Sequence, residues 1–212
     1  LPAGITVQFA TDTIDLMGAD VGFQISAVGN YTISGASGGT TIKGLSQLKN
    51  NYIGKTGDND GKNYGSGLIQ VIDTKNGNGS NTVTIKDITI SGGTFGDLET
   101  GGVAAVVGKV MTNQTITVEF DNVKVIDNTV INGKNKVGVL VGQVMGNTTI
   151  DVKNCAIENV TVNCSEGEAG KVIGCLTTKA PAKFDKPFKE WVKEVKLNLV
   201  EGKLKRETVM LG

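Results

Sequence analysis

The sequence repeats itself with a period of about 34 residues. The segment "VGKVMTNQTITVEF" begins at Val107, and the related segment "VGQVMGNTTIDVKN" begins 34 residues later, at Val141. A more divergent copy, "GLIQVIDTKNGNGSNTVTIKDITI", begins at Gly67, and a partial copy, "GKVIGCL", begins at Gly170. A period of this length is typical of solenoids, in which each repeat stacks on its neighbour because it cannot bury its apolar face alone.

Within each copy, apolar and polar residues alternate. The alternation in "TITVEF" (115–120) has a period of two, which marks a strand with one buried face. Each copy holds three such runs: 103–111, 115–120 and 123–131 in one, and 137–145, 148–155 and 157–164 in the next. An antiparallel sandwich would not make residues 34 apart alike, because its strands have individual environments. We therefore predict an all-β parallel β-helix with three strands per coil of about 34 residues.

The predicted β-helix covers residues 1–178, with an aperiodic loop insertion at 46–65. Residues 179–212 are predicted to form a C-terminal cap, a helix followed by a hairpin around 201–202. Phe188, Trp191, Val192 and Val195 follow a helical spacing, with Asp185 as the expected N-cap. We expect Trp191 to cover the open end of the solenoid, whose strand edges would otherwise be exposed.

Composition excludes several classes of function. The 21 basic and 21 acidic residues cancel, whereas a nucleic-acid partner requires a basic excess. Histidine is absent, which excludes catalysis by Ser-His-Asp or Cys-His arrangements. Arg206 is the single arginine, so bidentate recognition of phosphate or carboxylate groups is not expected.

Three cysteines, Cys155, Cys164 and Cys175, allow at most one disulfide and predict no disulfide framework. No stretch reaches the ~18 apolar residues of a transmembrane helix. The first residues, "LPAGITVQFA", lack the basic segment of a signal peptide and are expected to be a mature or trimmed beginning.

The 46–65 insertion carries the candidate binding residues. Tyr52 and Tyr64 offer aromatic faces on which sugars could stack, and insertions on one face of a solenoid often bind ligands. Asp58 and Asp60 resemble part of a calcium loop, but its twelfth position would be Gly67 rather than glutamate. They are therefore weak candidates for a calcium site, with a polar turn as the alternative.

No catalytic residue and no cofactor are predicted. At an offset of 34, Glu119 would lie against Lys153 and Asp121 against Cys155, so no acidic pair is expected at stacked positions. A lyase would need a lysine or arginine base with calcium-bound carboxylates, for which Asp58 and Asp60 are candidates. Stacked outward threonines, Thr115 and Thr149 among them, raise the further possibility of ice binding, although Asp151 interrupts the row.

The glycine-containing runs "GGVAAVVGKV" (101–110), "KVGVLVGQV" (136–144) and "AGKVIGCL" (169–176) resemble a known repeat. They are similar to the "GGLVG" repeats of right-handed parallel β-helix proteins of the pectin-lyase-like superfamily, in particular non-catalytic members on bacterial cell surfaces. The resemblance implies an exported module for adhesion or glycan binding. Catalytic relatives use aspartates with histidine, or calcium-binding aspartates with arginine, and those roles have no counterpart in these coils.

The sequence therefore supports three hypotheses. The first is a non-enzymatic secreted or cell-surface module that binds a glycan or a host or matrix surface. The second is a polysaccharide lyase or depolymerase, and the third is a structural spacer within a larger surface protein. Fold alone does not decide among them, because one fold carries many functions.

Overall fold

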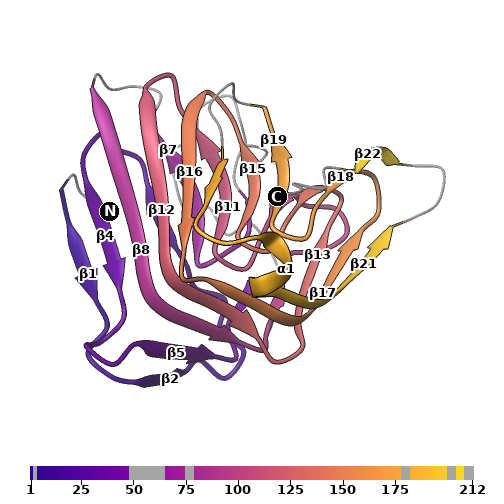
Figure 1. The fold of residues 1–212 in the computed structure, drawn as a ribbon, viewed down its shortest axis with the longest axis horizontal. Coiled ribbons are helices and arrows are strands. Elements are labelled where there is room, and N and C mark those ends of the chain that lie inside the picture. Colours follow the sequence, from indigo (N-terminus) through magenta and orange to yellow (C-terminus); the bar gives the residue numbers. More distant parts are fainter. Residues whose placement is uncertain (2–3, 48–64, 75–78, 178–181, 200–203, 208–212) are drawn as a thin grey trace.

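The computed structural model describes residues 1, 4–47, 65–74, 79–177, 182–199 and 204–207. It is a parallel β-solenoid of about 4 turns, with equivalent positions about 35 residues apart and one short C-terminal helix. All strand pairs in the described residues are parallel. The chain winds from one end of the molecule to the other (Figure 1). The predicted fold class is confirmed.

Sheet A contains 13 strands and wraps around three faces of the solenoid. Its strands are β1 (Thr6–Gln8), β2 (Thr13–Asp15), β4 (Tyr31–Ser34), β5 (Thr40–Lys43), β6 (Ser46–Gln47), β8 (Ser80–Ser91), β9 (Thr94–Phe95), β12 (Thr115–Ile126), β13 (Thr129–Gly133), β16 (Asn147–Lys153), β17 (Ala156–Cys164), β20 (Ala182–Phe184) and β21 (Val192–Leu199). The long strands β8 and β12 run down one side and bend beneath the molecule (Figure 1).

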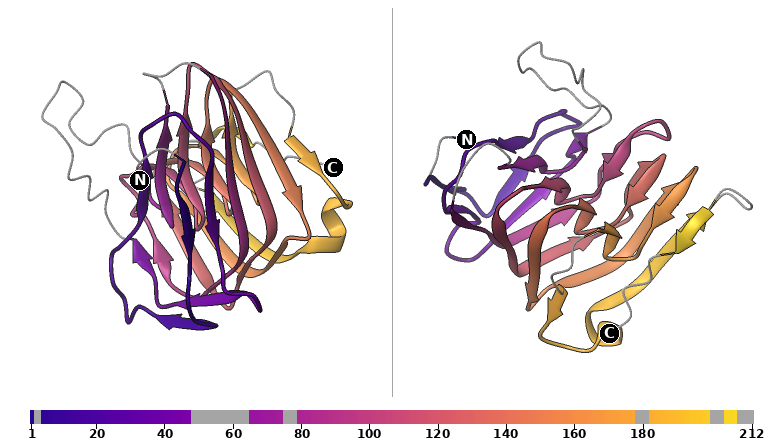
Figure 2. Two further views of the ribbon diagram at one scale, coloured as in Figure 1. Left: turned by 90° about the vertical axis from the view of Figure 1, so that its left-hand side faces the viewer. Right: turned by 90° about the horizontal axis from the view of Figure 1, so that it is seen from above.

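Two smaller sheets close the remaining side. Sheet B consists of β3 (Phe23–Ile25), β7 (Ile69–Asp73), β11 (Val107–Met111), β15 (Val141–Val144) and β19 (Ile173–Leu176). Sheet C consists of β10 (Gly101–Val103), β14 (Asn135–Val137), β18 (Gly167–Ala169) and β22 (Leu204–Glu207). Successive coils lie side by side from the N-terminal end to the C-terminal end (Figure 2).

The corners of sheet A are made by asparagine and aspartate residues in the left-handed region. Asp87, Asn122 and Asn154 have φ of 56°, 54° and 54°, and they divide the first face from the second. Asparagine and aspartate reach this region at lower cost than other residues with a Cβ atom. The Asn122 side-chain amide donates to Asp87 Oδ1 over 2.9 Å, which ties one corner to the next coil.

The core consists of inward side chains stacked in columns. Ile33, Ile85, Phe120 and Val152 occupy register-matched positions on β4, β8, β12 and β16, and each is at most 1% exposed. Each coil therefore buries its apolar face against the coils on either side, which explains why a single repeat would not be stable.

The coil is divided more finely than the three predicted strands. The run 103–111 forms two strands, β10 and β11, and the run 123–131 divides at Asp127 and Asn128, which have φ of 60° and 59°. Alternation of apolar residues continues across such a corner, so the pattern did not reveal it. The run 148–155 corresponds to the single strand β16.

The register also differs from the repeat in the sequence. Ile116 and Ile150 lie on adjacent parallel strands, β12 and β16, as predicted, but Val118 rather than Ile116 is the partner of Ile150. The reason is turn length: β11 ends at Met111 and β12 begins at Thr115, whereas β15 ends at Val144 and β16 begins at Asn147. A shift of two residues preserves the inward face, because side chains alternate with a period of two.

The C-terminal part differs from the predicted cap. The helix α1 covers only Phe188–Trp191, and Val192 and Val195 lie on β21 instead. Pro187 occupies the N-cap position, while Asp185 accepts a hydrogen bond from the Asn154 backbone over 2.8 Å.

The predicted hairpin is also wrong for the described strands. β21 pairs parallel with β17, and β22 pairs parallel with β18. Both strands add a rung to existing sheets, because their apolar positions match the columns of the preceding coil. Trp191 is 5% exposed and stacks on Phe184 with ring centroids 5.7 Å apart, so it covers apolar side chains of the last coil.

Candidate functional site

The binding residues predicted from the sequence lie outside the described residues. Tyr52, Asp58, Asp60 and Tyr64 all belong to the segment 48–64, so their role as binding or calcium-coordinating residues stays a prediction. The candidate site is therefore built from the outer surface of the coils that the structure describes.

Sheets B and C form two layers, which we call the double-layered side. A Cβ atom at Gly142 on β15 would lie 2.5 Å from Val103 N on β10, and one at Gly174 on β19 would lie 2.4 Å from Val137 N on β14. The backbones of the two sheets are thus in direct contact, and every residue of β11 and β15 is buried. The outer surface of sheet B offers no room for a ligand.

Sheet A forms the single-layered side, and its outward side chains reach the surface. A polar groove with a volume of ≈ 370 Å³ lies at the corner between its first and second faces. We call it the corner groove; it is lined by Asp12, Thr13, Gly38, Gly39, Thr40, Thr41, Asp87, Thr89, Asn122 and Lys124. None of these residues has a large apolar side chain.

The corner groove crosses four successive coils. Thr13 pairs with Thr41, Thr41 pairs with Thr89, and Thr89 pairs with Lys124, so these outward side chains form a row perpendicular to the strands. Neighbouring strands are about 4.8 Å apart, so the row is roughly 14 Å long. The groove can therefore hold an extended ligand parallel to the solenoid axis.

One lip of the corner groove is a loop of the second coil. Ser34 pairs with Lys86 and Thr40 pairs with Ile88, so residues 35–39 lie opposite Asp87 alone. The Thr40 hydroxyl donates to Thr11 O over 2.7 Å and accepts from the Ala36 backbone N–H over 3.0 Å. These two hydrogen bonds hold the lip against the first coil.

A second group of polar side chains lies on the first face of sheet A. Glu119 on β12 pairs with Thr84 on β8 and with Asp151 on β16. The Thr84 hydroxyl donates to Glu119 Oε2 over 3.1 Å, and Lys153 Nζ lies 2.9 Å from Asp151 Oδ2. The hydrogen bond and charge of Asp151, with smaller contributions from other carboxylates, raise the pKa of Lys153 above its usual range.

This group corrects the prediction that no acidic residues would stack. The prediction applied the offset of 34 to the whole coil, which placed Glu119 against Lys153. The observed offset between β12 and β16 is two residues smaller, so Glu119 lies beside Asp151 and Asp121 lies beside Lys153. The unequal lengths of the two preceding turns were the signal in the sequence that could have revealed it.

The outward threonine rows shift in the same way. Thr82, Thr117 and Thr149 form one row, and Ser80, Thr115 and Asn147 form another. The Asn147 side-chain amide donates to the Thr115 hydroxyl over 2.8 Å. These rows make the first face a polar surface with alternating hydroxyl, amide and charged groups.

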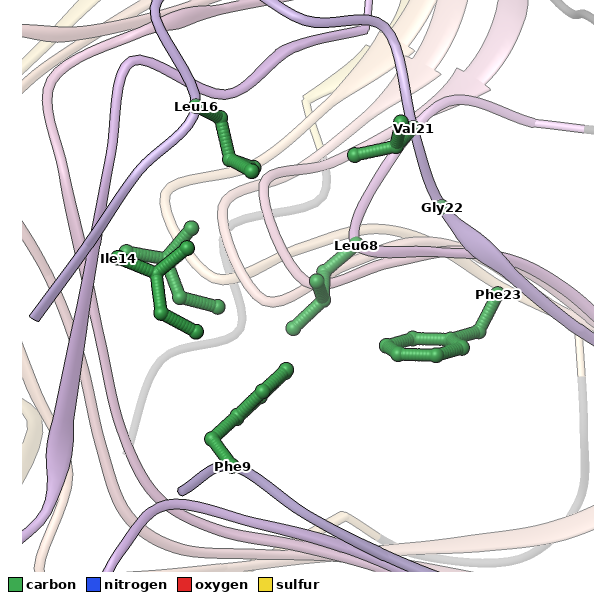
Figure 3. Close-up of a pocket in the computed structure, with 8 residues that line it drawn as sticks. Phe9, Ile14, Leu16, Val21, Gly22, Phe23 and Leu68 are labelled. Atoms are coloured by element: carbon green, nitrogen blue, oxygen red, sulfur yellow. The ribbon is translucent and has the colours of Figure 1, made fainter. Parts of the chain in front are cut away.

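An apolar cavity of ≈ 160 Å³ lies at the N-terminal end of the solenoid (Figure 3). It is lined by Phe9, Ile14, Leu16, Val21, Gly22, Phe23, Ile42 and Leu68. The Phe9 and Phe23 rings are 6.4 Å apart at a tilted angle. The cavity is part of the core that the first coil leaves uncovered.

The three cysteines are buried and free. Burial raises the pKa of Cys155 to about 12, and burial also raises the pKa of Cys164. Because the thiolate is the reactive form, these side chains act as small core residues rather than as nucleophiles.

Within the ranges that the structure describes, no group of three or more His, Cys, Asp or Glu side chains is placed to hold a metal ion. Over the same residues, no helix has the length and apolarity needed to cross a membrane. No protein family, no curated protein and no solved structure matches the chain. Its parallel β-solenoid architecture therefore rests on the strand pairing itself.

Proposed function

We propose that this protein is a non-enzymatic glycan-binding module that is secreted or displayed on a cell surface, of the type found in the pectin-lyase-like superfamily. The observation that carries the proposal is the corner groove, a polar channel across four coils with no large apolar side chain in its lining. The resemblance of its glycine-containing runs to bacterial surface repeats supports the exported location.

The chemistry of the corner groove suits sugar hydroxyl groups, which both donate and accept hydrogen bonds. Asp12 and Asp87 supply acceptors, Lys124 supplies donors, and the threonine hydroxyls supply both. Two carboxylates against one ammonium favour a neutral or amine-bearing glycan over a polyuronate. The fixed side-chain pairs, such as Asn122 with Asp87, reduce the entropy lost when a ligand binds.

Binding to the corner groove can be measured by calorimetry with a panel of neutral, amino-bearing and acidic oligosaccharides. We expect binding in the micromolar range to neutral or amino-bearing members. Lys124→Ala should weaken it about tenfold, because a hydrogen bond from a charged group is lost. Lys193→Ala is the matched control, since Lys193 is an exposed lysine on the same face of the last coil. Equal affinity of both variants and wild type would refute the groove as the site.

A polysaccharide depolymerase is the second candidate, and the stacked pair Glu119 and Asp151 is the observation that favours it. Two neighbouring carboxylates, with Lys153 beside them, supply the kinds of group that act as acid and base on a glycosidic bond. Incubation with polysaccharides, with and without calcium, should release unsaturated ends from a lyase and new reducing ends from a hydrolase. Activity that Glu119→Gln and Asp151→Asn both abolish would replace the first proposal.

A structural spacer is the remaining alternative. It predicts that no oligosaccharide of the panel binds even at high micromolar concentration, and that no polysaccharide is cleaved. The exported location has a separate test: an antibody against this chain should label intact cells of the source organism, and external protease should remove the signal.

A further inference from the structure

The two ends of the solenoid present unpaired strand edges. At the N-terminal end, β1, β2 and β3 each pair with one described strand, β4, β5 and β7 respectively. At the C-terminal end, β19, β20 and β21 also pair with one described strand each. Such edges are templates for pairing with another chain.

The free edges at the two ends correspond to one another. β1 and β20 are the two ends of the first face of sheet A, β2 and β21 those of the second face, and β3 and β19 those of sheet B. All of these strands run in the same direction. A second copy shifted along the solenoid axis would therefore extend three columns at once, with parallel pairing throughout (Figure 2).

The apolar surfaces at the two ends are complementary. The N-terminal end contains the ≈ 160 Å³ cavity of Figure 3, and Val21 and Met17 nearby are 48% and 87% exposed. A cavity of about 150 Å³ with apolar walls accommodates one benzene ring. The C-terminal end carries Phe188, a partly buried aromatic side chain on α1, whose ring has that size.

The charges of the two ends also differ in sign. Residues 1–42 contain three aspartates, Asp12, Asp15 and Asp20, and no lysine or arginine. Residues 182–199 contain five lysines against three acidic residues, Asp185, Glu190 and Glu194. Two N-terminal ends would repel one another, as would two C-terminal ends, whereas an N-terminal end attracts a C-terminal end.

We propose that copies of this protein associate end to end, with the N-terminal coil of one copy seated on the C-terminal coil of the next. The occupant of the apolar cavity is then the aromatic surface around α1 of the neighbouring copy. Because the two contacting surfaces differ, the contact is heterologous and produces open chains rather than a closed dimer. The corner groove and the first face of sheet A stay outside the contact, so they would continue from copy to copy.

Analytical ultracentrifugation of the 212-residue chain tests the proposal. We expect the average mass to rise continuously from low to high micromolar protein, without a plateau at the dimer. The association should weaken in about 1 M salt, where the screening length falls to about 3 Å. A chain that stays monomeric at every concentration, or that stops at a dimer, would overturn the proposal.

Two variants identify the surfaces. Val21→Lys places an ammonium at the exposed apolar rim of the N-terminal end, and the double change Lys189→Glu with Lys193→Glu reverses the charge of the C-terminal end. Each variant alone should associate at least about tenfold more weakly than wild type. All of these side chains are exposed by a third or more, so circular dichroism and the unfolding midpoint should match wild type.

The mixture of the two variants distinguishes end-to-end association from its alternatives. Each variant keeps one intact end, so an equimolar mixture should form a 1:1 dimer that does not grow further. Association of the lysine double variant with itself would show that two N-terminal ends meet, and the proposal would then be wrong. The outcome is independent of glycan binding, since neither variant alters a residue of the corner groove.

Discussion

The double-layered side and the single-layered side of this solenoid follow different packing rules. In sheets B and C, the outward positions of one sheet touch the backbone of the other, as at Gly142 and Gly174. In sheet A, the outward positions carry threonine, asparagine, glutamate and lysine, and the side chains reach solvent. The same coil thus contains a region whose sequence is fixed by contact between backbones and a region whose outer face is free to vary.

The difference explains the most regular motif in the chain. Gly108, Gly142 and Gly174 recur in the repeat because a Cβ atom at any of them would lie within 2.8 Å of backbone atoms. On the single-layered side, only inward positions are constrained in this way. Ligand-binding groups can therefore be placed on sheet A without loss of core packing, and the corner groove lies there.

The largest expected effect is a substitution on the double-layered side. Gly142→Ala would place a methyl group 2.5 Å from Val103 N and 2.6 Å from Gly108 O, so the two sheets must separate. We expect the free energy of unfolding to fall by about 3 kcal/mol, measured by urea denaturation.

The matched substitution on the single-layered side is Thr149→Ala, at an outward position of the next strand, β16. It removes a solvent-facing side chain and should lower the free energy of unfolding by less than about 1 kcal/mol. Equal losses for Gly142→Ala and Thr149→Ala would contradict the distinction between the two sides.

An intermediate effect is expected for a row of asparagines on the third face of sheet A. The Asn163 amide donates to Asn132 Oδ1 over 2.7 Å and accepts from the Asn198 amide over 2.7 Å. Asn163→Ala removes both hydrogen bonds and should cost about 1–2 kcal/mol of unfolding free energy, whereas Asn198→Ala removes one and should cost about half as much. Identical costs would show that the row does not act as a connected set.

The smallest effect on stability is expected for the exposed ion pair on the first face. Asp151→Asn removes the main group that raises the pKa of Lys153, so NMR titration of the Lys153 ammonium should show a lower pKa. The folded chain binds this proton more tightly than the unfolded chain, so the stabilisation is complete at neutral pH. It is lost as the pH rises through the alkaline titration of Lys153. An unchanged Lys153 pKa in the variant would mean that the pair is not formed in solution.

The fold was predictable because apolar alternation and the repeat act over the whole coil. The pairing of the strands that carry Ile116 and Ile150 needed only these two signals. The candidate site was less predictable. The stacking of Glu119 on Asp151 depends on two turns of different length, and the corner groove depends on a five-residue loop opposite Asp87. Neither feature changes the periodicity that was read.

The C-terminal part shows the same limit from the opposite direction. Phe188, Trp191, Val192 and Val195 have a helical spacing, but only the first two lie on α1. Val192 and Val195 were recruited into β21 because β17 offered an unpaired edge along its whole length. A local pattern cannot register the presence of such an edge, because the edge is formed by residues more than 30 positions away.

The amino-acid sequence by itself determined that the chain coils, where its inward faces lie and which positions must be glycine, since these depend on side-chain size and period. The tertiary structure alone decided the register between coils, the corners that divide each strand run and the placement of polar groups on the outer faces. The physical reason is that a parallel ladder tolerates a shift of two residues at no cost to the core, so turn length rather than the repeat selects which outward side chains meet.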